Sequence, residues 1–150
     1  MVSNADDYRT IFEAVPSLSN GITFCTGSLG PRPDNDLVKM ATEFAERIHF
    51  THLRNVRRQD DGSFFESDLL DGDLNLVGVI AVLLAVLLKG EQRRRRAGRE
   101  DWEIPLRPDY GHLLLEDIDK KTNPGYSMIG RMKGLAEIRG VITALEANYD

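Results

Sequence analysis

Short apolar runs along the chain alternate with longer segments in which apolar and polar positions are mixed. The runs at residues 22–25, 48–56 and 104–109 contain β-branched residues, which is typical of buried strands. Two prolines weaken the third assignment, because proline cannot donate a hydrogen bond to a neighbouring strand. The pattern predicts three strands, with a glycine-rich loop after the first and a loop of charged and small residues after the second.

A segment with helical spacing follows each strand, because its apolar residues recur at intervals of three and four. The predicted helices occupy residues 37–45, 71–88 and 127–145. Asp34 or Asn35 is the expected N-terminal cap of the first helix, and Asp71 or Asp73 that of the second. Residues 7–14 are interpreted as the end of a helix or a lead-in turn.

The predicted order is strand then helix, three times over, which implies right-handed crossovers and a parallel sheet. Three such units cannot close a barrel, since closure takes eight units and typically about 250 residues. An open sheet of three strands would leave both edges unpaired. We therefore expect an α/β chain that is part of a larger assembly.

Composition agrees with a globular protein and gives no sign of a polyanionic partner. Hydrophobic residues make up 41% and charged residues 29% of the 150 residues, and the net charge is −5. We expect neither a nucleic-acid partner nor an anionic membrane. A single cysteine excludes an intrachain disulfide, and no secretory signal is visible at the N-terminus, so a cytoplasmic location is expected.

Two segments invite other interpretations. Residues 76–88 are entirely apolar or glycine, but a membrane span needs about 20 such residues, so a core helix is favoured. The four arginines at 93–96 resemble a nucleic-acid or localisation patch. Acidic residues surround them, which favours a solvated loop.

The predicted strands end at three residues that can bind metals: Cys25, His52 and Asp109. Ligands gather at the carboxyl ends of strands in parallel α/β folds, and thiolate, imidazole and carboxylate all bind divalent transition metals. The three side chains can converge only if their strands are neighbours. A small buried cysteine and a hydrogen-bonded core histidine remain the alternatives. His49, three positions from His52, should face the opposite side of its strand.

Several motifs resemble the mannonate dehydratase family. They are Asn-Gly-Ile-Thr-Phe-Cys-Thr-Gly-Ser-Leu-Gly at 20–30, Arg-Ile-His-Phe-Thr-His-Leu-Arg-Asn at 47–55, Arg-Pro-Asp-Tyr-Gly-His at 107–112, Lys-Thr-Asn-Pro-Gly-Tyr at 121–126, and the segment 129–140. The resemblance runs in consistent order from about residue 10 to residue 145. It implies a (β/α)8 TIM barrel of the xylose-isomerase-like kind, with residues 1–150 as a C-terminal fragment holding about the last three βα units.

The resemblance also implies a function. The family consists of lyases that eliminate water from D-mannonate to give 2-keto-3-deoxy-D-gluconate, using Mn²⁺ or Fe²⁺, in hexuronate breakdown. It implies that Cys25, His52 and Asp109 are metal ligands. Tyr126, and Tyr110 beside the last ligand, become candidates for proton transfer.

Two arginines just beyond strand ends suit the substrate carboxylate, because guanidinium pairs with it in a bidentate manner. They are Arg54 and Arg107, and a structural ion pair is the alternative for each. Three departures from the family pattern predict impaired or absent activity for this chain alone. Tyr110 and Leu69 stand where the family has histidines, and the first barrel strands, with another histidine ligand, are missing.

Other functions remain open beside the lyase. The chain could be a non-catalytic remnant, or a subunit that completes a barrel by forming a homo-oligomer or by binding a complementing N-terminal half-barrel chain. A different sugar isomerase or epimerase on the same fold would need a second acidic ligand or base at a strand end, and the sequence offers no clear one.

Overall fold

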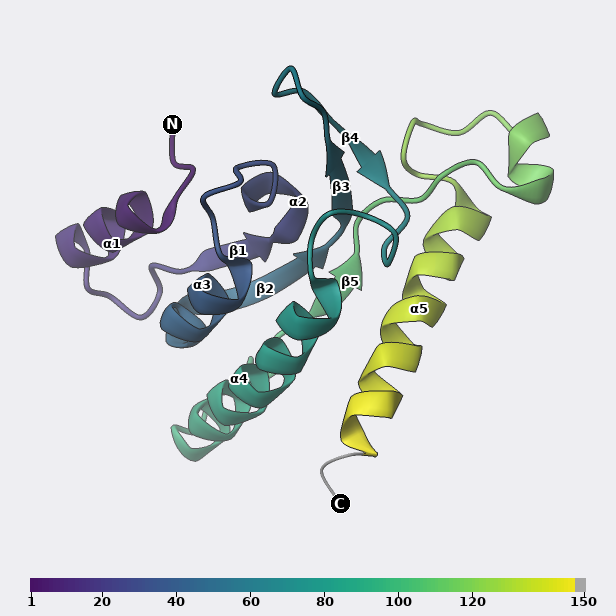
Figure 1. Cartoon of the computed structure of the whole chain (residues 1–150). Helices are drawn as coiled ribbons and strands as arrows, with labels where there is room; N and C mark the ends of the chain where they lie inside the picture. The colour runs from purple at the N-terminus through teal and green to yellow at the C-terminus, as the bar shows by residue number, and fades with distance from the viewer. Residues whose placement is uncertain (148–150) are drawn as a thin grey trace.

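A parallel sheet of three strands organises the chain, as the sequence predicts (Figure 1). The computed structural model describes residues 1–147. Strand β2 (Ile48–Leu53) lies in the middle, between β1 (Ile22–Cys25) and β5 (Leu106–Pro108). The pairing begins before β5 itself, since the Pro105 carbonyl accepts a hydrogen bond from the Thr51 amide at 2.9 Å. The prolines therefore shorten this strand without removing it from the sheet.

Five α-helices and a hairpin surround this sheet in the described part of the chain. The helices are α1 (Ala5–Ala14), α2 (Thr26–Leu29), α3 (Leu37–Glu43), α4 (Leu76–Arg96) and α5 (Met128–Glu146). Two 3₁₀ turns, η1 (Ala45–Arg47) and η2 (Leu115–Asp119), precede β2 and α5. The hairpin consists of β3 (Asn55–Arg58) and β4 (Phe64–Ser67) and projects beyond the carboxyl ends of the strands (Figure 1).

The two faces of the sheet differ sharply. Alternate side chains of a strand point to opposite faces. Phe24 and Leu53 point to what we call the helix-covered face, where they are fully buried with apolar residues of α3 and α4. What we call the open face carries Thr23, Cys25, Phe50, His52 and Arg107, several of them partly exposed. The hydrophobic core thus lies on one side of the sheet only.

The helix caps differ from the predicted ones. Asp36 caps α3 by accepting a hydrogen bond from the Lys39 amide at 3.1 Å, because Asp34 is engaged by Arg32 and Asn35 donates to backbone carbonyls. Asn75 caps α4 and accepts from the Gly78 amide. Neither Asp71 nor Asp73 takes this place, and the Asp73 carboxylate instead accepts from the Arg58 amide. The carboxylates of Asp34 and Asp73 thus accept hydrogen bonds from other donors and do not cap the helices.

One of the N-terminal segments is more helical than predicted. Helix α1 begins at Ala5, where Asn4 and Asp7 form a reciprocal capping box, so residues 7–14 are the end of a helix, one of the two predicted alternatives. A helical turn, α2, replaces the expected glycine-rich loop after Cys25. This turn brings Ser28 back toward Cys25, three residues earlier in the chain.

The predicted second strand is divided between two sheets. Residue Arg54 separates β2 from β3, and β3 pairs antiparallel with β4, where the sequence indicated a strand followed by a loop. The Thr26 hydroxyl accepts a hydrogen bond from the Arg54 amide and donates one to the Arg54 carbonyl, at 2.9 and 2.6 Å. Asn55, 1% exposed, donates to the carbonyls of Leu69 and Leu74. These polar contacts redirect the chain out of the parallel sheet.

Helix α4 continues through the arginine run, so the expected solvated loop is wrong. The helix ends at Arg96 with four cations in its last turn, where they face the negative end of the helix dipole. Arg93 pairs with Glu46 at 2.5 Å, and Arg95 lies over the Trp102 ring at 3.4 Å. The apolar part of α4 is a core helix, as predicted. Among the described residues, no helix is long and apolar enough to cross a membrane.

Candidate metal centre

Cys25, His52 and Asp109 converge at the carboxyl ends of the three parallel strands. Each offers one ligand atom, and these atoms all lie within 4.8 Å of one another. The strand order accounts for this, because β2 is central and its register sets His52 beside both Cys25 and Arg107. His49 stays outside the cluster and lies against Gly21. The spacing therefore predicted the meeting of the three side chains correctly.

The donor set fits one divalent transition metal ion. Two ligands at about 2.0–2.3 Å from a single ion lie at most about 4.5 Å apart, so the cluster needs only a small contraction to bind one. Within the cluster, His52 Nδ1 lies 3.7 Å from Asp109 Oδ2. All three side chains are mostly buried, with exposures of 9% for Cys25, 22% for His52 and 16% for Asp109. Sulfur, nitrogen and oxygen donors together suit Mn²⁺, Fe²⁺ or Zn²⁺.

The surroundings of His52 favour its neutral form. Burial lowers the pKa of His52, while Asp109 raises it and the guanidinium groups of Arg107 and Arg54 lower it again. The net shift is downward, and the neutral imidazole is the form that binds metals. The Phe50 ring meets the imidazole edge-on, with centroids 4.9 Å apart.

Arg54 lies between the cluster and the hairpin. Its Nη1 donates to Glu66 Oε1 at 2.7 Å, its Nη2 donates to Ser28 Oγ at 3.2 Å, and its Nε is 4.0 Å from Asp109 Oδ2. Burial lowers the pKa of Arg54, but Cys25, Glu66 and Asp109 outweigh it and raise the pKa overall. Burial raises the pKa of Glu66, and Arg54 only partly offsets that.

Arg107 and Tyr126 share an open hollow of about 410 Å³ beside β5. The Arg107 guanidinium is 46% exposed, 3.3 Å from Asp109 Oδ1, and lies 5.6 Å from the centre of the Phe50 ring. Tyr126 is 55% exposed, with the Arg131 guanidinium 5.4 Å from its ring centre. This predicted pair is therefore accessible from solvent.

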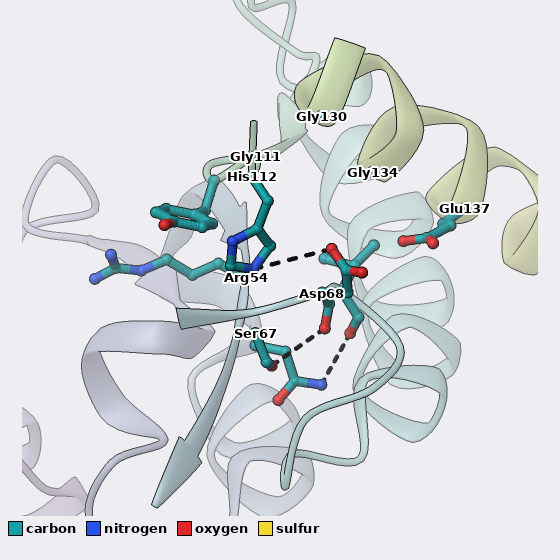
Figure 2. A pocket seen from close by; sticks show the side chains of 11 residues that line it. Arg54, Ser67, Asp68, Gly111, His112, Gly130, Gly134 and Glu137 are labelled. Atoms are coloured by element: carbon teal, nitrogen blue, oxygen red, sulfur yellow. Dashed lines mark hydrogen bonds and ion pairs between the residues drawn. The ribbon is translucent and has the colours of Figure 1, made fainter. Parts of the chain in front are cut away.

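Tyr110 and Arg54 line a different and much smaller cavity, of about 10 Å³, which has room for about one water (Figure 2). Leu69 also lines it. The His112 ring meets the Tyr110 ring edge-on, with centroids 4.9 Å apart. Its Nε2 faces Asp68 Oδ1 at 4.0 Å (Figure 2). The two predicted tyrosines thus lie in separate hollows.

Four polar residues near the cluster were missed from the sequence: Ser28, Glu66, Asp68 and His112. Ser28 donates a hydrogen bond to Cys25 Sγ at 3.2 Å, which the helical turn α2 makes possible. Glu66 reaches Arg54 only because the hairpin folds back. His112 lies within the motif at 107–112, but the sequence alone assigns it no role.

These features define a class, namely a parallel α/β protein with a mixed-donor candidate metal centre at the carboxyl ends of its strands. The family model described as D-mannonate dehydratase (UxuA) matches residues 1–150. The chain belongs to the D-mannonate dehydratase family.

Individual relatives are similar over nearly the whole chain. A mannonate dehydratase of Saccharophagus degradans is 56% identical over 97% of this chain, and mannonate dehydratase 2 of Agrobacterium fabrum is 59% identical over 97%. The crystal structure of mannonate dehydratase from Streptococcus suis matches with a TM-score of 0.79 and 27% identity over 99% of this chain and 39% of that one. The chain spans about 36% of the length of these two curated relatives.

Proposed function

We propose that this chain is the C-terminal, metal-binding portion of a mannonate dehydratase, comprising about the last three βα units of a TIM barrel. The convergence of Cys25, His52 and Asp109 carries the proposal. Cys25 is a free thiol, which suits the reducing cytoplasm where we place the protein. Family membership supports D-mannonate as the substrate and Mn²⁺ or Fe²⁺ as the metal.

In this proposal Cys25, His52 and Asp109 hold the ion. When bound, the ion supplies Lewis-acid polarisation of the substrate carboxylate and hydroxyl groups. The guanidinium groups of Arg54 and Arg107 are the candidates to orient the carboxylate. A carboxylate fixed in this way makes the proton on the neighbouring carbon more acidic, which is the first requirement of an elimination.

The reaction breaks the C2–H and C3–O bonds of the sugar acid. The electron pair of the C2–H bond forms the C2–C3 double bond, and the hydroxyl leaves C3 with a proton as water. The resulting enol becomes the keto acid when C3 gains a proton and the C2 hydroxyl loses one. Tyr126 and Tyr110 are the candidates for proton transfer. Because Tyr110 and Leu69 stand where the family has histidines, the usual proton-shuttling side chains, slow turnover is expected.

The proposal is tested by metal binding and turnover measured on the same preparation. We expect the purified chain to bind Mn²⁺, and Cys25→Ser to weaken that affinity at least tenfold because a hydroxyl is a poor substitute for thiolate. Unchanged affinity in Cys25→Ser would remove the ligand assignment. Keto-acid formation from D-mannonate should be slow or absent for the chain alone, and rapid turnover would contradict the expected impairment.

A second candidate function is that of a subunit that completes a barrel with another chain. Within the described residues β1 and β5 each pair on one side only. Beside β5, helix α5 exposes apolar side chains at Met128 (65%), Met132 (59%) and Leu135 (43%). Such a surface is typical of an interface.

Size-exclusion chromatography and complementation separate the occupants of that surface. The chain would be mixed with the N-terminal two thirds of the Agrobacterium fabrum relative, and a stable complex with restored turnover would support a complementing half-barrel. Met132→Glu should abolish that complex while changing the stability of the chain by less than about 0.5 kcal/mol. A higher-order species of the chain alone would indicate a homo-oligomer. A compact monomer that does not bind the added segment would exclude this function.

A further inference from the structure

Arg54 forms several contacts around the candidate metal centre that the sequence does not predict. One guanidinium reaches Glu66 at 2.7 Å, Ser28 at 3.2 Å and, less closely, Asp109 at 4.0 Å. Ser28 in turn donates to Cys25 Sγ at 3.2 Å. Arg54 therefore forms a long ion pair with one of the three predicted ligands and reaches a second through one hydroxyl.

The backbone beside Cys25 holds the stem of Arg54 in place. The arginine side chain lies directly on Gly27, so close that a Cβ at that position would be 2.3 Å from Arg54 Cγ and 2.7 Å from Cδ. The Arg54 backbone is fixed as well, by the two hydrogen bonds with the Thr26 hydroxyl. The backbone of Arg54 and the stem of its side chain are therefore both held by neighbouring residues.

Glu66 anchors the guanidinium from the other side. Its carboxylate is 19% exposed and comes from β4, the second strand of the hairpin. Within the described residues Glu66 Oε2 is buried and has no hydrogen-bond partner, so its one strong contact is that with Arg54. A buried carboxylate whose only ionic partner is one guanidinium will hold that guanidinium firmly.

Arg107 offers a contrast. It touches Asp109 too, at 3.3 Å, but it is 46% exposed and opens on the larger hollow beside Tyr126. The Arg54 side chain is 25% exposed, and its two terminal nitrogens already donate to Glu66 and Ser28, while its Nε is buried without a hydrogen-bond partner among the described residues. A substrate carboxylate would have to break the Glu66 pair to reach Arg54, whereas Arg107 is accessible.

We propose that Arg54, anchored by Glu66, is a positioning residue that orients the Cys25 and Asp109 ligands, and that it leaves the substrate carboxylate to Arg107. The inference rests on the proposed metal centre and assigns the two arginines different roles there. Arginine suits this part because its planar group donates in several fixed directions at once, which the ammonium of lysine cannot do over the same span.

Cobalt binding to the full 150-residue chain tests the proposal, since the near-ultraviolet absorption of a thiolate–Co²⁺ bond reports Cys25 directly. We expect Arg54→Lys to bind Co²⁺ about tenfold or more weakly, in the range of lost outer contacts to metal ligands. It should also lower the thiolate band per bound ion. Arg107→Lys should leave that band unchanged. The matched control is Arg57→Lys, an exposed arginine three residues along the chain, which should match the unmodified protein.

Ser28→Ala is the second variant, because it removes only the link between Arg54 and Cys25. We expect the thiolate band and the Co²⁺ affinity of Ser28→Ala to lie between those of the unmodified protein and Arg54→Lys. If Arg54→Lys does not fold, Ser28→Ala alone tests the positioning role. A folded Arg54→Lys with unchanged band and affinity, or an unchanged Ser28→Ala, would overturn the positioning role. Absence of any thiolate band in the unmodified chain would instead refute the proposed metal centre.

Discussion

The two faces of the sheet show how one short strand can carry both stability and chemistry. On β1, Phe24 points to the helix-covered face and is fully buried, while its neighbour Cys25 points to the open face and joins the cluster. The same alternation on β2 separates Leu53 from His52. Because consecutive side chains point in opposite directions, packing and ligand placement are set independently by adjacent residues.

The largest expected difference between the faces is in folding stability. Phe24→Ala should cost about 3–5 kcal/mol, because it leaves a cavity among fully buried side chains. Phe50→Ala, the same change on the open face of the next strand, should cost about 1 kcal/mol since the ring is only partly buried. Urea unfolding followed by circular dichroism measures both. Equal costs would mean that the open face is packed as tightly as the other.

The open face should gain stability from the metal. At a Mn²⁺ concentration 100 times the dissociation constant, binding to the folded chain alone adds about 2.7 kcal/mol to the free energy of unfolding. A chelator should reverse the gain, and Cys25→Ser, with at least tenfold weaker affinity, should gain at most about 1.4 kcal/mol at the same concentration. Thermal unfolding with and without Mn²⁺ provides the measurement, and equal stabilisation of Cys25→Ser would locate the ion elsewhere.

The smallest expected effect is a pH dependence at Glu66. Burial raises the pKa of this carboxyl above its ordinary value near 4.5, so the ionised form is less favourable in the folded chain than in the unfolded one. The contribution of Glu66 to stability is therefore full below about pH 4.5 and is lost as the pH rises through the folded pKa. Glu66→Gln should be the more stable protein at neutral pH, with no difference at low pH.

Unfolding curves of both proteins across this pH range check the sign. A variant that is less stable at neutral pH would show that the Arg54 pair outweighs the burial of the carboxylate. The expected result means that the buried Glu66 carboxylate lowers the stability of the folded chain. Its role is then to hold Arg54 in place and not to stabilise the packing.

The parallel sheet was predictable because its signals are local and periodic. Apolar runs and helical spacing depend only on neighbouring residues, and the strand order follows from βα crossovers. The three candidate ligands followed from the same rule, since parallel strands bring their carboxyl ends to one edge. Neither the strand order nor this convergence depends on particular side-chain contacts.

The hairpin and the caps depended on competition between contacts. Asp61-Gly62 is a recognised hairpin signal, and Gly62 has a φ of 84°, but the charged and small residues around it are equally typical of a loop. Without the hairpin, Glu66 had no predicted neighbour, and the environment of Arg54 remained undetermined. The caps Asp36 and Asn75 were missed because nearby polar residues are equally good candidates until their other partners are known.

The missing side chain at residue 27 links two positions that are far apart in the sequence. Since the stem of Arg54 occupies the space that any larger residue would need, a homologue with alanine or serine at 27 must carry a shorter or differently directed residue at 54. Substitutions at the two positions should therefore occur together or not at all. Such a paired pattern would record in the evolutionary history of these proteins a constraint that neither residue displays by itself.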